Sequence, residues 1–212
     1  SNDATEIVGS AYVTYQPWEN WFFDTLLGYG AISNESERWS ALDQARLNGD
    51  RNGSVIYGSL AVNNQMRYEK LDLIPYVRLD INKYNLDSFA ESGGLFGLNY
   101  HASDFYTKSL ASGVTISQPF KIGEKDILTP SAKLQYRYTA ESQMDQQVSY
   151  INFISSNNYT MNGGATPTNT GSLGLGFNYD TAPFIFTFDW LGSMGSNEYK
   201  SNRFDVSVRA TF

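Results

Sequence analysis

Strict alternation of apolar and polar residues along most of the chain restricts its fold more than any other feature. Within Pro183–Leu191 the even positions are all aromatic, and the positions between them are Ile185, Thr187 and Asp189. The same period of two recurs in four further runs: Trp21–Ala31, Pro130–Tyr138, Gly171–Asp180 and Phe204–Phe212. Because neighbouring side chains of a strand point to opposite faces, such runs predict amphipathic strands. The sequence therefore predicts an all-β fold.

Four weaker runs bring the expected number of strands to nine: Thr5–Gln16, Ser54–Asn64, Leu73–Tyr84 and Tyr106–Phe120. No segment shows convincing helical spacing, although the loop residues Glu35–Asn48 are compatible with a short helical turn. No run approaches 18 consecutive apolar residues, so no transmembrane helix is expected. A search for long apolar runs does not detect the strands of a membrane barrel, because their apolar residues alternate with polar ones.

The connections between these strands alternate in length. The short ones are Pro17–Asn20, Asn64–Asp72, Lys121–Asp126 and Asp180–Pro183. The long ones are Ile32–Gly53, Asn85–Phe105, Thr139–Thr170 and the shorter Gly195–Asn202. Short turns on one side and long loops on the other are typical of outer-membrane barrels. With nine strands, the first must begin on the long-loop side and the last must end on the short-turn side.

Aromatic residues gather near the ends of the expected strands. Trp21 and Tyr29 are eight residues apart, which is about 26 Å along a strand and about 20 Å of height at a tilt of roughly 40°. That height is near the lipid-facing band of such barrels, about 25 Å. The expected aromatic girdle is Tyr15, Trp18, Trp21, Tyr29, Tyr84, Phe184 and Trp190. A soluble β-sandwich or lipocalin-like barrel also has alternating strands, but two aromatic belts favour a membrane.

Composition excludes several classes of function. The chain of 212 residues has 15 Lys and Arg against 22 Asp and Glu, and this acidic balance argues against a nucleic-acid partner. It has no Cys, which excludes disulfide scaffolds, thiolate metal sites and a Cys nucleophile. Its single His excludes zinc enzymes that need several imidazoles. We expect neither a metal nor a cofactor.

Four segments carry a further signal: YVTYQPWENWFFDTLLGYG (12–30), LIPYVRLDINKYNLDSFAESG (73–93), ILTPSAKLQYRY (127–138) and RFDVSVRATF (203–212). In this order, and with Phe212 as the last residue, they resemble the C-terminal translocator barrel of type V secretion autotransporters. The resemblance implies an antiparallel transmembrane β-barrel in the Gram-negative outer membrane. Its function would be to mediate passage of an N-terminal passenger to the cell surface, without enzyme activity.

The resemblance also raises a question of completeness. Barrels of that family have twelve strands, whereas nine are expected here. Residues 1–212 are therefore expected to form the barrel domain without its first three strands, pore helix and passenger. Nine strands alone would leave two open edges that lipid cannot satisfy, so we expect an incomplete chain or partner strands. The partners that the resemblance implies are outer-membrane lipid, the barrel-assembly machinery and the chain's own passenger, with the barrel itself a monomer.

Two sets of residues are candidates for these roles. The polar faces of the strands supply the residues expected to face the lumen: Asp24, Arg78, Asp80, Lys133, Arg137, Asp189, Asp205 and Arg209. Their mixed signs indicate ion pairs between strands and a hydrated pore that a polypeptide can pass, and the alternative interpretation is that they are ordinary hydrogen-bonded polar residues of a barrel interior. The apolar face of the last strand consists of Phe204, Val206, Val208, Ala210 and Phe212. The resemblance implies that this strand is the signal read by the assembly machinery, and its side chains are also expected to contact lipid.

A different class of function is open at His101, which lies three residues before Asp104 in a long loop. An outer-membrane hydrolase or protease barrel would use such a pair to activate water, but a base must itself be oriented by a third group. No convincing third group lies nearby in sequence, and no G-x-S-x-G motif occurs. We therefore expect a solvated loop histidine. A passive structural or pore barrel is the remaining alternative.

Overall fold

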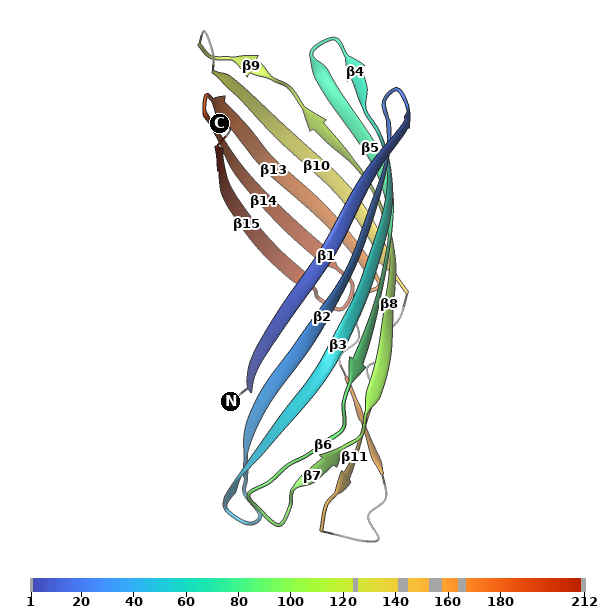
Figure 1. Ribbon diagram of the computed structural model, residues 1–212, viewed down its shortest axis with the longest axis vertical. Coiled ribbons are helices and arrows are strands. Elements are labelled where there is room, and N and C mark those ends of the chain that lie inside the picture. Colours follow the sequence, from blue (N-terminus) through green and yellow to red (C-terminus); the bar gives the residue numbers. More distant parts are fainter. Residues whose placement is uncertain (1, 124–125, 141–144, 153–157, 164–166, 211–212) are drawn as a thin grey trace.

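The computed structural model describes residues 2–123, 126–140, 145–152, 158–163 and 167–210. These residues form β-strands and the connections between them (Figure 1). Over the same ranges, the structure has no helix that is long and apolar enough to cross a bilayer. The expected all-β class is confirmed.

Nine long strands build one antiparallel sheet, in which each strand pairs with the next long strand along the chain. They are β1 (Asn2–Trp18), β2 (Trp21–Ser40), β3 (Ala45–Asn64), β5 (Leu71–Leu86), β8 (Ser103–Ser117), β10 (Ile127–Thr139), β13 (Asn169–Thr181), β14 (Phe184–Gly195) and β15 (Lys200–Ala210). Two short strands extend the sheet: β4 (Met66–Tyr68) pairs with β5, and β9 (Phe120–Lys121) pairs with β10. All nine expected strands are present.

The sheet curls across its width, and β1 and β15 are its two edges (Figure 1). The start of β1 lies toward the end with the long connections, whereas β15 ends among the short turns. An odd number of antiparallel strands requires that the first strand begin on one side and the last strand end on the other, as observed. The curl gives the sheet a concave and a convex face.

The concave face is identified by a pocket of about 340 Å³ that residues of distant strands share. Tyr12 on β1, Asp24 on β2 and Lys133 on β10 all line it, although β1 and β10 are not neighbours in the sheet. The convex face carries exposed apolar side chains instead. Examples are Leu27, Leu60, Leu134, Phe177, Phe186 and Val206, each at least 40% exposed.

Few apolar side chains of this structure are buried. Among the described residues, the buried ones are Leu47, Val55, Ala111 and Val148. A soluble domain of this length would bury a contiguous core, and large exposed apolar surfaces mark contact with another phase or partner. The apolar residues of this chain therefore face outward, as in a strand-built membrane protein.

The segment Ile32–Gly53 differs from the expectation. We expected a loop there, compatible with a short helical turn in Glu35–Asn48, but β2 and β3 continue as a hairpin as far as Ser40 and Ala45. The ion pair of Glu37 with Arg46, at 2.9 Å, links the two strands. Their extension is therefore an antiparallel ladder that leaves only residues 41–44 as a turn.

Contacts from distant segments explain this extension. Leu47 is only 1% exposed, because residues 93–94 cover it. Gly93 has a φ of 105°, and a Cβ there would lie 2.3 Å from the Arg46 carbonyl oxygen. Only glycine allows the backbone to approach this closely in that conformation. The extension of the two strands could therefore not be predicted from the residues of Ile32–Gly53 alone, because the residues that cover Leu47 belong to another loop.

A second, four-stranded sheet stands at the long-loop end and is here called the cap sheet. Its strands, in spatial order, are β12 (Tyr159–Asn162), β11 (Asp145–Tyr150), β7 (Leu98–Tyr100) and β6 (Phe89–Ala90). They come from two segments that we expected to be loops, Asn85–Phe105 and Thr139–Thr170. Backbone hydrogen bonds between Asn48 and Ser92, 2.8 and 2.9 Å long, join the cap sheet to β3.

Candidate functional site

Asp80 is the centre of the charge network on the concave face. Its carboxylate accepts hydrogen bonds from Ser59 Oγ at 2.7 Å, Arg137 at 2.9 Å and Arg78 Nε at 3.1 Å. Arg137 also donates to Ser109 Oγ at 3.0 Å. These five residues come from β3, β5, β8 and β10, so the network ties four neighbouring strands together. A hydrogen-bonded network that links four strands in this way rigidifies the wall that carries it.

Asp24 forms a second, smaller network beside the edge strand β1. Its carboxylate accepts from Thr14 Oγ1 on β1 and from Asn63 Nδ2 on β3. Because these partners lie on either side of β2, the bonds run across three strands.

A third group surrounds Lys133, whose Nζ lies 5.0 Å from the centroid of the Tyr76 ring. Lys133, Asp189 and Asp205 line one pocket of about 420 Å³. Asp189 and Asp205 are directly opposite each other on β14 and β15. Arg203 lines the same pocket and pairs with Asp205 at 2.7 Å.

Sequence reasoning missed Arg203, although the signal was present. Arg203, Asp205 and Arg209 are all at odd-numbered positions of one strand, and such positions share a face. The rule that predicts Asp205 on the polar face therefore predicts Arg203 there as well. The structure also brings Arg78, Asp80 and Arg137 into direct contact, which the spacing alone did not specify. Arg209 lies at the position of β15 opposite Ile185. That these residues face a lumen stays a prediction.

The expected girdle residues divide into two groups. Tyr15, Trp18, Trp21, Tyr29 and Phe184 are exposed, and Trp190 is half-buried beside Gly192. Tyr84 requires a correction, because it lies on the same face as Arg78 and Asp80. Its ring stacks on Phe105, with 4.5 Å between the ring centroids. Tyr84 is an even number of residues from Asp80, so it cannot share the lipid-facing side of Val77 and Leu79.

The last strand, β15, presents its apolar side chains on the convex face. Phe204, Val206 and Val208 are 66%, 75% and 60% exposed, and they pair with Trp190, Phe188 and Phe186 of β14. Ala210 continues the row and is half-buried, while Phe212 lies outside the described residues. The role of this strand as an assembly signal stays a prediction.

The expected alternative site in the loops is not assembled as a His–Asp pair. His101 Nε2 lies 3.3 Å from Ser149 Oγ, whereas Asp104 lies 4.0 Å from Lys83 Nζ. The two side chains thus contact different partners. Across the described residues, no group of three or more His, Asp or Glu side chains could hold a metal ion.

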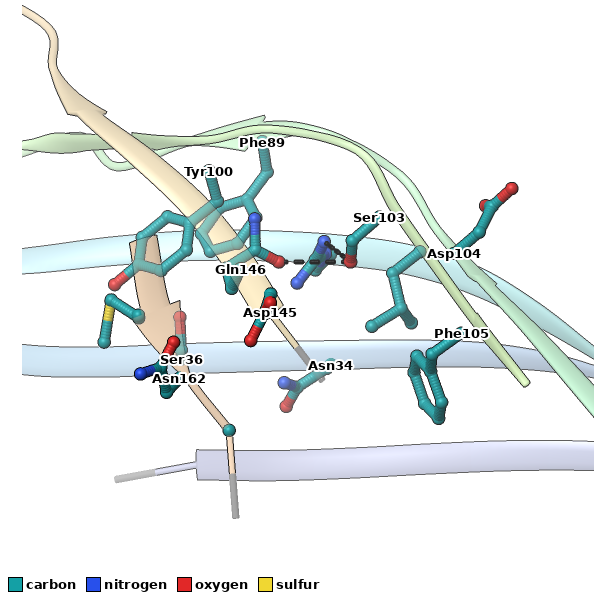
Figure 2. A pocket seen from close by; sticks show the side chains of 14 residues that line it. Asn34, Ser36, Phe89, Tyr100, Ser103, Asp104, Phe105, Asp145, Gln146 and Asn162 are labelled. Carbon is teal, nitrogen blue, oxygen red and sulfur yellow. Dashed lines mark hydrogen bonds between the residues drawn. The ribbon is translucent and has the colours of Figure 1, made fainter. Parts of the chain in front are cut away.

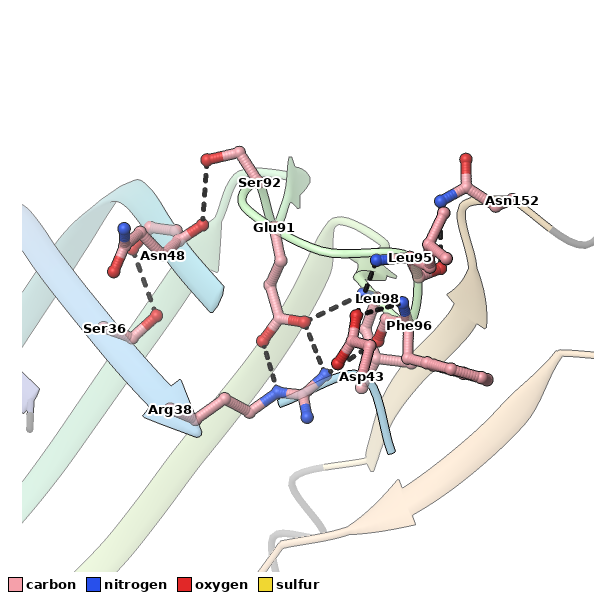
Figure 3. A network of polar contacts seen from close by, with 11 residues as sticks. Ser36, Arg38, Asp43, Asn48, Glu91, Ser92, Leu95, Phe96, Leu98 and Asn152 are labelled. Atoms are coloured by element: carbon pink, nitrogen blue, oxygen red, sulfur yellow. Dashed lines mark hydrogen bonds and ion pairs between the residues drawn. The ribbon is translucent and has the colours of Figure 1, made fainter. Parts of the chain in front are cut away.

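An ion pair with a buried carboxylate, on Glu91, connects the cap sheet to the β2–β3 hairpin (Figure 3). Arg38 donates through Nε and one terminal nitrogen to the two carboxylate oxygens of Glu91, at 2.7 and 2.6 Å. The Glu91 side chain is only 3% exposed and also accepts from the Leu98 N–H at 2.8 Å. The hydrogen bonds that Arg38 donates to Glu91 raise the pKa of Arg38, against the opposing effect of burial. This two-point contact fixes the loop that precedes β7.

The fold and these two faces define a class of protein. A curled antiparallel sheet, apolar on its exposed convex face and polar on its concave face, is the wall of an outer-membrane type β-barrel. Residues 1–206 match the model of the autotransporter β-domain. The chain belongs to this family, and it is therefore an outer-membrane translocator barrel of a Gram-negative bacterium.

Comparison with solved structures agrees with the family. The chain is similar to the translocator domain of the autotransporter NalP from Neisseria meningitidis, with a TM-score of 0.74 and 18% identity. That match covers all of this chain and 68% of the other, and it shows the fold. The ferric yersiniabactin uptake receptor FyuA from Yersinia pestis matches with a TM-score of 0.41 and 10% identity, over 98% of this chain and 38% of that one. The second likeness is too distant to support an argument. No curated protein sequence matches the chain.

Proposed function

We propose that the concave face forms the wall of a hydrated channel through which a passenger polypeptide crosses the outer membrane. The observation that carries the proposal is the contrast between the two faces of the sheet. Asp80 is held by two arginines and a serine, and Asp205 by Arg203, so the wall carries charges of both signs and several of them are paired. A polar wall with charges of both signs stays hydrated but does not hold a passing chain by a strong field of one sign.

The channel requires closure of the sheet, and we propose that additional strands supply it between β1 and β15. Both edges carry backbone groups that lipid cannot satisfy. The domain of residues 1–212 would then be the part of a twelve-stranded barrel that follows its first three strands, pore helix and passenger. Closure by strands of the same polypeptide would make the barrel a monomer.

We propose that the domain performs no chemistry itself. Translocator domains are generally not enzymes. The one histidine and the nearby Asp104 have separate contacts, so the residues favoured for a loop-borne hydrolase do not form a unit. Assay of the purified barrel against peptide and ester substrates tests this proposal, and turnover that is lost in His101→Ala would contradict it.

We also propose that β15 and Phe212 form the signal read by the barrel-assembly machinery. The exposed row Phe204, Val206 and Val208 on an edge strand supports this role, since an unpaired edge offers both backbone groups and apolar side chains. Deletion of Phe212 should lower the amount of heat-modifiable barrel in outer membranes. The barrels that do assemble should keep the unfolding temperature of the unaltered protein, and an equal loss of stability would argue for a purely structural role.

Site-specific photocrosslinking tests the channel. In the full-length protein, with its passenger stalled by an engineered disulfide loop, a photoreactive amino acid replaces Lys133 or its neighbour Leu134. Lys133 lines the concave face, whereas Leu134 is 63% exposed on the convex face. Crosslinks to the stalled passenger should form from position 133 and be absent from position 134. Crosslinks from both positions, or from neither, would contradict a passage along the concave face.

A further inference from the structure

A pocket of about 350 Å³ lies at the long-loop end of the barrel, between the β2–β3 hairpin and the cap sheet (Figure 2). Asn34 and Arg51 line it from the concave face of the hairpin, where they are directly opposite each other. Tyr100 on β7 and Asn162 on β12 line it from the cap sheet. The pocket is thus enclosed by two folded elements that sequence analysis treated as loops.

An aromatic platform forms one part of the lining. The rings of Tyr100 and Phe89 are stacked, with centroids 4.5 Å apart and an angle of 5° between their planes. The guanidinium carbon of Arg51 lies 5.7 Å from the centroid of the Phe89 ring. Because Tyr100 is supported in this way, it offers a flat surface of fixed orientation, suited to the apolar C–H face of a ring-shaped ligand.

A buried acceptor forms the second part. Asn34 Oδ1 is buried and has no hydrogen-bond partner among the described residues. Its cross-strand neighbour Arg51 is turned away, since it donates to the Asp87 and His101 carbonyl oxygens at 2.8 and 3.2 Å and to Ser103 Oγ at 3.2 Å. A buried acceptor without a donor is unfavourable in the free protein. Asn34 lines the pocket, so a small rotation of its side chain would present this oxygen to a hydroxyl or N–H group of a ligand.

The charges of the lining select among ligands. Its one arginine, Arg51, already donates to three neutral oxygens. The lining also contains two carboxylates, Asp104 and Asp145. Phosphate, sulfate and carboxylate ligands would therefore be repelled, whereas hydroxyl donors would be accepted. Asp104 lies 4.0 Å from Lys83, which weakens its attraction for a basic peptide.

We propose that this pocket binds a neutral saccharide. The C–H face of one sugar ring would pack on Tyr100, and a sugar hydroxyl would donate to Asn34 Oδ1. The volume lies at the small end of ligand pockets, about 300–1,000 Å³, which suits a terminal sugar of a longer glycan. Because Asn34 and Arg51 lie on the concave face, a saccharide bound here would lie beside the outer end of the proposed channel. The glycan could belong to the lipopolysaccharide of the same membrane or to an external surface.

Binding is measured on the full-length protein in lipid nanodiscs by saturation-transfer NMR. The probes are glucose, galactose, mannose and N-acetylglucosamine, together with tetralysine as a basic peptide. We expect binding of at least one sugar and no binding of tetralysine. Tyr100→Ala and Asn34→Ala should each weaken the sugar by about tenfold or more, whereas Tyr100→Phe should keep it. Asn99→Ala is the matched control, because Asn99 precedes Tyr100 on β7 and points to the other face.

Heat-modifiable migration confirms that each variant is folded before its affinity is compared. Competition by vesicles of smooth lipopolysaccharide would assign the glycan to the outer leaflet, and binding of free sugars without such competition would assign it to an external source. Both results support a saccharide pocket. Absence of sugar binding by folded protein, unchanged affinity in Asn34→Ala and Tyr100→Ala, or tetralysine binding in place of sugars would overturn it.

Discussion

Two neighbouring residues of β15, Ser207 and Val208, separate the lipid face from the channel face. Val208 is 60% exposed on the convex side, and Ser207 pairs with Thr187 on the concave side. We expect Val208→Lys to cost roughly 2–4 kcal/mol near the membrane midplane, because it places a charge in lipid, and Ser207→Lys to cost little. The measurement is the amount of heat-modifiable protein in outer membranes. Equal losses for the two variants would mean that the faces of β15 are assigned wrongly.

Removal of a carboxylate from the concave face should have an effect that depends on its partners. Asp80 has a side chain that is 16% exposed and receives three hydrogen bonds, whereas Asp205 is 54% exposed and pairs with Arg203. Asp80→Ala leaves Arg137 without its carboxylate in a half-buried position and should cost about 1–3 kcal/mol. Asp205→Ala should cost less than about 1 kcal/mol. Urea unfolding of barrels reconstituted in lipid vesicles compares the two, and a larger effect at Asp205 would refute this ranking.

The cap sheet depends on a contact between elements, the ion pair of Arg38 on β2 with Glu91. Arg38→Ala would leave the Glu91 carboxylate, which is 3% exposed, with the Leu98 N–H as its remaining donor, at a cost of about 1–3 kcal/mol. We expect the loop of residues 87–102 to become sensitive to protease on intact cells, while the barrel stays heat-modifiable. Arg46→Ala is the control, since Arg46 is 73% exposed and its pair with Glu37 is worth at most about 1 kcal/mol. Unchanged protection in Arg38→Ala would show that other contacts hold the cap.

Elements differ in how far the sequence could predict them. The nine long strands follow from local alternation, because each strand that separates lipid from water must present one apolar face. The extension of β2 and β3 beyond Tyr29 has no such lipid face, and its order depends on residues 91–95 of another loop. Period-two reasoning cannot detect that dependence.

The candidate site shows the same division. Parity along a strand placed Asp80 and Arg137 on polar faces, but their contact joins residues that are 57 positions apart. Only the order of the strands and their register bring these two side chains together. The pocket beside Asn34 was missed for a related reason, since its lining combines one hairpin with a sheet formed from two distant loops.

On the scale of the whole molecule, the edges β1 and β15 determine how the barrel closes. The chain has no Cys, so a single engineered pair reports on proximity without background from this domain. In the full-length protein we expect Val13→Cys on β1 and Val206→Cys on β15 to form no disulfide on oxidation, because other strands would lie between them. The control pair is Leu175→Cys with Trp190→Cys, which are opposite each other on β13 and β14 and should crosslink. A disulfide between positions 13 and 206 would show that nine strands close directly.

The long β2–β3 hairpin has a consequence for the direction of insertion. Each of its strands has 20 residues, about 66 Å of chain, of which Trp21 to Tyr29 accounts for about 26 Å. The remainder carries charged residues such as Glu35, Glu37 and Arg38 past the lipid to the outer side. These groups must cross before Arg38 can engage Glu91, and withdrawal would require that this ion pair be separated again. Folding of the outer end therefore opposes withdrawal of the β2–β3 hairpin, because the contacts that hold the hairpin in place form only on the far side of the membrane.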